Sequence, residues 1–462
     1  MNKLQLIFCF FILAAIDSAT FAQNAFNVSL LDQWNNTNLV SNSSQVRYSD
    51  CYGFTHLGEE YAVIGSTEGT HVFKITPENL LLEIGFVRGR FSSSFVQHRE
   101  FAVIKNYLYA VCDEGVSSLQ IIDLNYLPDS IHLIHEDSVQ FGRVHNIFID
   151  TVQERLYSCI HRSTTNTQQI SAPLKIFSLS NPLQPIELWS GPDDVVEVHD
   201  IHVRNGKAIL NCGYDGLRVY DFTNTNNPLY LDSKSIYQDQ GYNHQGWLTP
   251  DGKTYLFADE TNGKRVKKCS FNGQQITIQT LFGTNYLNGS VPHNIKATND
   301  FAFVAYYNEG LRIFDLSTPT PKEIAFFDSY PDESSFKMNG NWGIYADLPS
   351  ERLLISDRQY GLFLLDFDRK ALKQLQNNKE ISISPNPVNQ GESFMLSCPN
   401  NTTEIHWKVF DVSGNLVTEN SIYNFNFERI QLNVAPGTYH LKLVLVNSDQ
   451  TIQEANKKIV IL

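Results

Sequence analysis

The chain has 462 residues, of which 42% are hydrophobic, and a formal net charge of −14 with neutral histidines. Its 35 lysines and arginines are scattered rather than clustered. This distribution argues against binding to nucleic acid or an anionic membrane, since both need a basic patch. The length is sufficient for a large core and for more than one domain.

Residues 1–22 have the features of a signal peptide. Lys3 gives a short positive start, residues 4–16 (LQLIFCFFILAAI) form the apolar run, and Ala22 ends a small-residue cleavage site. We expect cleavage near Ala22 and a mature chain beginning at Gln23. No later stretch approaches the roughly 20 apolar residues of a transmembrane helix.

Most of the chain after the signal peptide repeats one pattern of strands and turns. Residues 291–330 predict four short strands separated by turns that contain Asn, Asp, Gly and Pro. Aligned on the residue that opens the first strand, the copies begin at Tyr52, His98, His145, His199, His244, His293 and Trp342. A period near fifty with four strands per copy is typical of a β-propeller. The sequence therefore predicts an all-β fold with a seven-bladed propeller over residues 23–366.

The last repeat lacks a fourth strand, because its third strand is followed by the polar stretch DRKALKQLQNNKE. Residues 27–35 (NVSLLDQWN) resemble the fourth strands of other repeats. We expect this N-terminal segment to supply the outer strand of the seventh blade and to close the ring, leaving no open edge.

Six cysteines remain in the mature chain, an even number that is compatible with disulfides in an exported protein. Cys112, Cys159 and Cys212 occupy nearly the same second-strand position in successive repeats. Such strands should lie farther apart than the roughly 7 Å Cα limit of a bridge. We expect small, buried, unpaired core cysteines instead.

Residues 367–380 form a polar linker, and residues 381–462 predict a small β-sandwich of short alternating strands. The motifs SPNPV (384–388), FDVSGNLV (410–417), APGTYHLKL (435–443) and the terminal KKIVIL resemble the type A sorting domain of type IX secretion cargo. The resemblance implies a Bacteroidota source, recognition by the type IX secretion machinery, and release or attachment at the cell surface.

The propeller is similar to the choice-of-anchor B proteins, whose repeats are of the LVIVD type. The resemblance rests on residues 52–75, 243–260, 292–317 and 326–366, which include PHNIKATNDFAFVAYYNEGLRIFDLS. That family is named for its interchangeable C-terminal sorting signals, which agrees with the tail found here. The resemblance supplies no molecular activity.

Five of the seven repeats open their inner strand with histidine, so we expect a ring of imidazoles at one mouth of the central channel. Turns that follow the second strands bring carboxylates to the same face. This arrangement predicts a zinc or copper site, because such ions take imidazole nitrogens and carboxylates as ligands. The predicted metal ligands are His145, His199, His244 and His293. The predicted ligand-binding residues are Tyr52, His98, Asp113, Asp215, Glu260, Glu309 and Trp342.

Another interpretation of the histidines is structural: each one hydrogen-bonds the backbone of a neighbouring blade or channel water. His202 lies three residues after His199 and so faces the other side of the strand, where we expect it to pack between blades.

Three functions remain open. The first is an exported, surface-attached or released binding protein with one His- and acid-lined face. The second is a metal-dependent enzyme, oxidative or hydrolytic, that uses the same face. The third is a structural module that docks another protein.

Overall fold

The computed structural model describes residues 25–165, 168–284, 289–331, 338–369, 381–391, 393–399, 401–423 and 427–462. The predicted signal peptide and most of the predicted linker lie outside these residues. The described chain is all-β, and the helical element named within it is the short 3-10 turn η1 (Tyr307–Glu309). The predicted fold class is confirmed.

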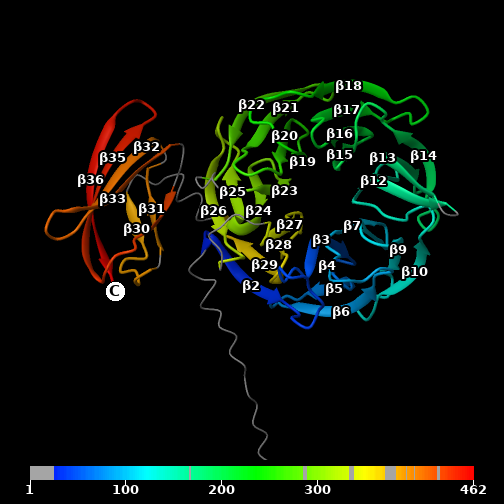
Figure 1. Cartoon of the computed structure of the whole chain (residues 1–462), viewed down its shortest axis with the longest axis horizontal. Helices are drawn as coiled ribbons and strands as arrows, with labels where there is room; N and C mark the ends of the chain where they lie inside the picture. Colours follow the sequence, from blue (N-terminus) through cyan, green and yellow to red (C-terminus); the bar gives the residue numbers. More distant parts are fainter. Residues whose placement is uncertain are drawn as a thin grey trace, which may run out of the picture.

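Seven antiparallel sheets surround a central axis (Figure 1). The first three, from the inner to the outer strand, are β3 (Tyr48–His56), β4 (Glu59–Ser66), β5 (Gly69–Ile75) and β6 (Leu81–Arg88); β7 (Arg99–Ile104), β8 (Tyr107–Cys112), β9 (Leu119–Asp123) and β10 (His132–Asp137); and β11 (Asn146–Asp150), β12 (Arg155–Thr165), β13 (Gln168–Ser178) and β14 (Ile186–Gly191).

The next three sheets follow the same order. They are β15 (Asp200–Arg204), β16 (Lys207–Asn211), β17 (Leu217–Asp221) and β18 (Leu229–Lys234); β19 (Asn243–Leu248), β20 (Thr254–Asp259), β21 (Val266–Phe271) and β22 (Ile276–Phe282); and β23 (Pro292–Ala297), β24 (Phe301–Tyr306), β25 (Gly310–Asp315) and β26 (Lys322–Phe327), to which β1 (Ala25–Phe26) adds a fifth strand.

The last sheet closes the ring. It consists of β27 (Asn341–Tyr345), β28 (Leu353–Asp357) and β29 (Gly361–Phe367), with β2 (Val28–Trp34) as its outer strand. β2 pairs antiparallel with β29, from Val28 opposite Phe367 to Trp34 opposite Leu362. The N-terminal segment thus supplies the missing strand, as the sequence predicted, and β29 has no open edge.

The cores lie between neighbouring blades because each sheet has two apolar faces. One core, for example, combines Ala102 and Tyr109 of the second blade with Ile147 and Leu156 of the third. Every inner strand is therefore held between two neighbours, which fixes the direction of its side chains at the channel. The six described cysteines are unpaired and buried, as predicted: Cys51, Cys112, Cys159, Cys212, Cys269 and Cys398.

The C-terminal residues form a sandwich of two sheets. One sheet contains β30 (Ser382–Ser384), β31 (Ser393–Ser397) and β34 (Phe427–Gln431); the other contains β33 (Leu416–Tyr423), β32 (Thr402–Phe410), β35 (Gly437–Asn447) and β36 (Ile452–Ile461). One apolar core, with Phe394, Trp407 and Leu443, joins the two sheets. In the described part of the chain, no helix has the length and apolar character needed to cross a bilayer.

Candidate functional site

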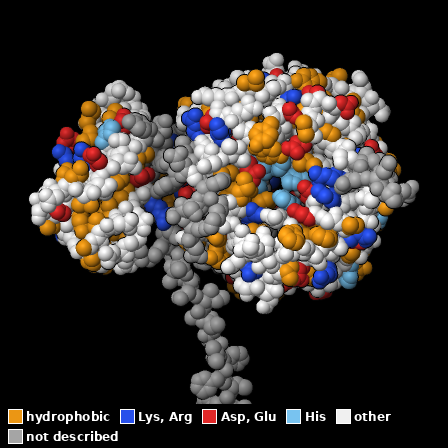
Figure 2. Space-filling model, in the orientation of Figure 1, with side chains coloured by type: hydrophobic (Ala, Val, Ile, Leu, Met, Phe, Trp, Pro, Cys, Tyr) orange, Lys and Arg blue, Asp and Glu red, His pale blue; other side chains and the backbone are white. Residues whose placement is uncertain are grey.

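A closed ring of aromatic side chains surrounds one mouth of the channel, and Figure 2 shows histidines gathered there among charged side chains. Its members are His98, His145, His199, His244, His293 and Trp342. Successive ring centroids lie 4.9, 4.2, 4.1, 4.3 and 4.2 Å apart, and Trp342 lies 5.2 Å from His98. The predicted ring of imidazoles is confirmed. We call these six residues the histidine ring.

The first blade contributes no aromatic side chain to the ring, which corrects the placement of Tyr52. In several blades the ring residue sits where the register of the inner strand shifts, as Trp342 does between Asn341 and Gly343. The corresponding shift in β3 falls between Tyr48 and Cys51, so Ser49 takes this place. The Tyr52 ring lies deeper in the channel, 5.0 Å from that of Tyr345.

Three ring members bond to the backbone of the next blade. The Nδ1 atoms of His199, His244 and His293 lie 3.1, 3.2 and 2.8 Å from the carbonyl oxygens of His244, His293 and Trp342. This repeated contact is the structural role that the sequence left open. It leaves Nε2 of each ring for another partner.

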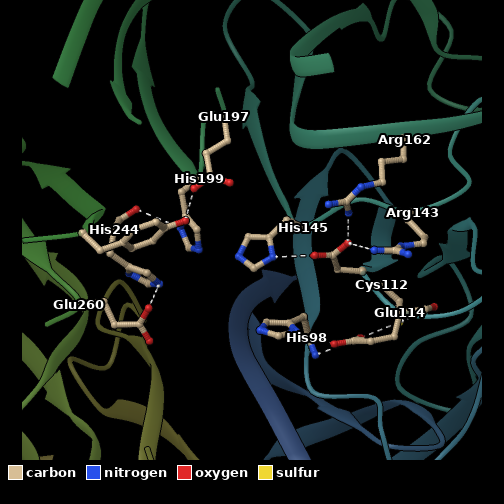
Figure 3. Close-up of polar contacts among 12 residues, drawn as sticks. His98, Cys112, Glu114, Arg143, His145, Arg162, Glu197, His199, His244 and Glu260 are labelled. Atoms are coloured by element: carbon tan, nitrogen blue, oxygen red, sulfur yellow. Dashed lines mark hydrogen bonds and ion pairs between the residues drawn. The ribbon is translucent and has the colours of Figure 1, made fainter. Parts of the chain in front are cut away.

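The other two histidines bond to carboxylates (Figure 3). His98 Nδ1 lies 2.5 Å from Glu114 Oε1, and His145 Nδ1 lies 3.0 Å from Asp113 Oδ2. Asp113 also accepts from Arg162 and Arg143. Burial raises the pKa of Asp113, but the His145 hydrogen bond and the surrounding positive charges hold it below the ordinary value.

These contacts fix the tautomer of all five histidines. A carbonyl or carboxylate oxygen only accepts, so Nδ1 carries the proton and Nε2 of the neutral ring carries a lone pair. Burial, followed by neighbouring imidazoles, lowers the pKa of His199 and His293 well below 6.5. Burial also lowers the pKa of His244 to about 4, although the Glu260 carboxylate opposes this shift. At neutral pH these three rings are therefore neutral. An Nδ1–H bonded to a carbonyl or carboxylate is also the usual support of a metal-binding histidine.

Several buried polar atoms near the sixth and seventh blades lack a hydrogen-bond partner. His293 is only 2% exposed and Trp342 only 5%, yet Nε2 of the first and Nε1 of the second are unpaired. Ser290 Oγ, both amide atoms of Asn341 and Nε of Arg358 are unpaired as well. An unpaired buried polar group is costly and signals a bound water, ion or ligand.

Two histidines of the ring and one neighbouring carboxylate have the spacing of a metal site. Potential ligand atoms of His244, Glu260 and His293 all lie within 4.8 Å of one another. Among the described residues, no comparable set includes His145 or His199. Of the four predicted metal ligands, His244 and His293 thus converge with Glu260, while His145 and His199 belong to no such set.

The predicted carboxylates also divide. Glu260 Oε2 lies 3.9 Å from His244 Nε2, and Asp113 bonds His145, so both contact the histidine ring. Asp215 instead accepts from the backbone N–H of Val196 at 2.8 Å. Glu309 pairs with Arg312 at 2.6 Å. In both cases a local partner holds the carboxylate of the turn, and neither contacts the histidine ring through a hydrogen bond.

Two residues near the ring were not singled out as site residues by the sequence. The hydroxyl of Tyr307 donates to Glu260 Oε1, and the Arg358 guanidinium lies 4.8 Å from the ring centroid of Trp342. Each follows the second strand of its blade, but no motif distinguishes it. His202 is 7% exposed and lies against Phe148 and Trp247, as expected of a residue packed between blades.

No family model matches the chain, and no curated protein does. Among solved structures, the extracellular domain of a hybrid two-component system of B. thetaiotaomicron has a TM-score of 0.52 at 11% identity, with 94% of this chain and 57% of that chain covered. This likeness shows the fold alone. The chain spans little more than half of that domain.

Two other structures are less similar. The Swd1 β-propeller domain of Myceliophteria thermophila has a TM-score of 0.47 at 12% identity, with 69% of this chain and 99% of that chain covered. The extracellular domain of a one-component system of B. thetaiotaomicron has a TM-score of 0.45 at 12% identity, with 93% and 60% covered.

Proposed function

We propose that this chain is an exported bacterial propeller that binds a transition-metal ion at the histidine ring and uses the ion to hold a ligand. Two observations carry the proposal: ligand atoms of His244, Glu260 and His293 all lie within 4.8 Å of one another, and Nε2 of His293 is a buried lone pair without a partner. Two imidazoles and one carboxylate match the donor preference of Zn²⁺ and suit Cu²⁺ as well.

The surroundings support this assignment. The Nδ1–H of His244 and of His293 is held by a backbone carbonyl, which orients each ring. The Tyr307 hydroxyl holds Glu260 from its other oxygen. Because the two rings are neutral at pH 7, a metal ion would displace no proton from them.

A metal-dependent enzyme is the second candidate. Three protein ligands leave one position of a tetrahedral ion open, which is the arrangement of catalytic zinc sites. The same position also accepts a donor atom of a bound molecule, so geometry alone favours neither use. Hydrolysis of p-nitrophenyl acetate or phosphate by the metal-loaded protein, lost in His293→Ala, would favour the enzyme.

The two ends of the chain support export. The signal-peptide pattern of residues 1–22 and the sorting-domain motifs of residues 381–462 suit a protein that crosses the outer membrane and is released or attached outside. The partner of the C-terminal sandwich would then be the type IX secretion machinery. The repeats suit a choice-of-anchor B protein, and the structural likeness extends to two extracellular bacterial domains.

The test is metal binding by the purified protein. We expect one Zn²⁺ or Cu²⁺ per chain by calorimetry and metal analysis. His293→Ala and His244→Ala should lower the affinity at least a hundredfold, because each removes a ligand. His132→Ala, on the exposed face of β10, should leave it unchanged. A wild-type protein without stoichiometric metal, or an unchanged affinity in His293→Ala, would overturn the proposal.

A further inference from the structure

A cavity with a volume of about 210 Å³ lies in the same channel, beneath the histidine ring. It begins with residues that directly follow ring positions on the inner strands: Asp50, Asn146, Asp200, Gln245 and Asn294. It extends to Thr151 and Asp347, which lie beyond the ends of β11 and β27 and are exposed. The cavity therefore opens toward the face opposite the ring. We call it the lower chamber.

Polar groups of both kinds face the lower chamber without a close partner. Asp50 and Glu100 share a side-chain hydrogen bond, while Oδ1 of Asp50 is buried against Gly343. Within the described chain, the amide of Asn294 makes no side-chain hydrogen bond, and no carboxylate lies within 4.0 Å of Lys296 Nζ. That ammonium instead lies 3.4 Å from the ring centroid of Trp247. The amide of Asn294 thus offers the chamber an acceptor and donors, and Lys296 offers further donors.

Most ionisable groups of the lower chamber are carboxyls. Four carboxyl groups line it (Asp50, Glu100, Asp200 and Asp347), with one ammonium group, that of Lys296. Burial raises the pKa of Asp200 to about 8 and raises those of Asp50 and Glu100, while it lowers the pKa of Lys296. Near pH 7 several of these carboxyls are therefore protonated. A neutral occupant then meets little unpaired charge, a cation can be matched by loss of a carboxyl proton, and an anion finds only Lys296.

The walls of the lower chamber are aromatic. Tyr52 and Tyr345 lie 5.0 Å apart on one side, while Phe148 and Trp247 lie 6.2 Å apart on another. Flat apolar faces between hydrogen-bonding side chains suit a molecule with an apolar ring face and a polar edge. Hydroxyl groups can donate to Asp50 and Glu100 and accept from Lys296 and Asn294.

We propose that the lower chamber binds a monosaccharide-sized polyhydroxylated molecule, either neutral or carrying an amino group, through Asp50, Glu100, Asn294 and Lys296. This site is separate from the histidine ring and does not depend on the proposed metal.

The test uses three pyranoses of one shape and different charge: D-glucosamine, D-glucose and D-glucuronate. Calorimetry or thermal shift with the purified protein should show saturable binding of glucosamine, weaker binding of glucose and none of glucuronate. Asp50→Asn should weaken glucosamine binding at least tenfold, since an acceptor that can ionise beside the amino group is lost. Asp129→Asn, an exposed position on the loop before β10, is the matched control and should change nothing.

Two further variants test whether the sugar binds in the lower chamber rather than at the histidine ring. His244→Ala should leave glucosamine binding intact, which separates the chamber from the ring. Lys296→Met should lower the affinity for glucose, since a donor is removed. The proposal is overturned if neither glucose nor glucosamine binds at tens of millimolar, if glucuronate binds as well as glucosamine, or if Asp50→Asn binds like wild type.

Discussion

The Nδ1 atom of His293 lies 2.8 Å from the carbonyl oxygen of Trp342 in the next blade. This bond joins two blades and at the same time turns Nε2 into an unpaired lone pair. The same contact therefore serves both interpretations of the repeated histidines. The inter-blade bond positions the ring, and the ring presents the atom that a metal ion would use.

The first prediction concerns pH. Burial lowers the pKa of His244 to about 4 and that of His293 well below its ordinary 6.5. Protons therefore compete with metal only in acid, and Zn²⁺ affinity should change little between pH 8 and about 5.5 before falling toward pH 4. Calorimetric titrations at three pH values measure this profile. An affinity that falls with a midpoint near 6.5 would show that these rings are not the ligands.

The second prediction uses His202, whose pKa falls to about 3 because it is buried and because Lys296 is near. Between pH 6.5 and 3 the His202 imidazole is protonated in the unfolded state but neutral in the folded state. The free energy of unfolding therefore decreases as pH falls through this range. His202→Phe removes that cost and should unfold with a free energy higher than wild type by about 1.4 kcal/mol per pH unit below 6.5.

Urea denaturation at pH 7.5 and 5.5 measures the difference for His202→Phe. His132→Phe, at an exposed position on β10, is the control and should show the same pH slope as wild type. Parallel slopes for His202→Phe and wild type would contradict the assignment of a neutral buried imidazole.

The third prediction concerns an ion pair within the fifth blade. The ammonium of Lys267 contacts Asp259, and both side chains are 0% exposed. Lys267→Met leaves a buried carboxylate without its cation and should lower the free energy of unfolding by about 3 to 5 kcal/mol. Lys267→Met with Asp259→Asn removes the charge as well and should recover part of the loss. A cost below about 1 kcal/mol for the single variant would contradict this reasoning.

The fold and the ring were predictable because both repeat. Turn residues and strand patterns recur near every fifty residues, and the five histidines recur with them. The closing strand was predictable because the last repeat lacked its own. Tyr52 was misplaced because the shift in register of β3 moves the ring position to Ser49, and a shift in strand pairing leaves no mark in the residue pattern.

Other parts of the site had no such signal. Asp215 and Glu309 occupy turns like that of Glu260, but a backbone N–H and an arginine hold them, and those partners appear only in three dimensions. The lower chamber combines single residues from separate blades, such as Asp50 and Lys296, that share no motif. Its formation depends on closure of the ring.

The last prediction tests that closure at Gly361, the first residue of β29, where φ is +89°. A Cβ atom at this position would overlap the carbonyl oxygen of Trp34 at the end of β2, while a Cβ at Gly58, where φ is +84°, would meet nothing within 4 Å. Alanine should cost about 1 kcal/mol at Gly58 for backbone strain alone. At Gly361 it should cost about 2 to 4 kcal/mol, since either β2 or β29 must also move.

Thermal and urea unfolding of Gly361→Ala and Gly58→Ala measure the two costs. Limited proteolysis should then cut β2 faster in Gly361→Ala than in Gly58→Ala, because the loosened strand leaves the sheet more often. Equal stability of the two variants, with equal cleavage of β2, would mean that pairing with β29 does not hold the ends of the ring together. The metal affinity of Gly361→Ala then tests whether ring closure supports the proposed metal site. Trp342, whose carbonyl accepts the hydrogen bond from His293 Nδ1, belongs to the same blade as β2.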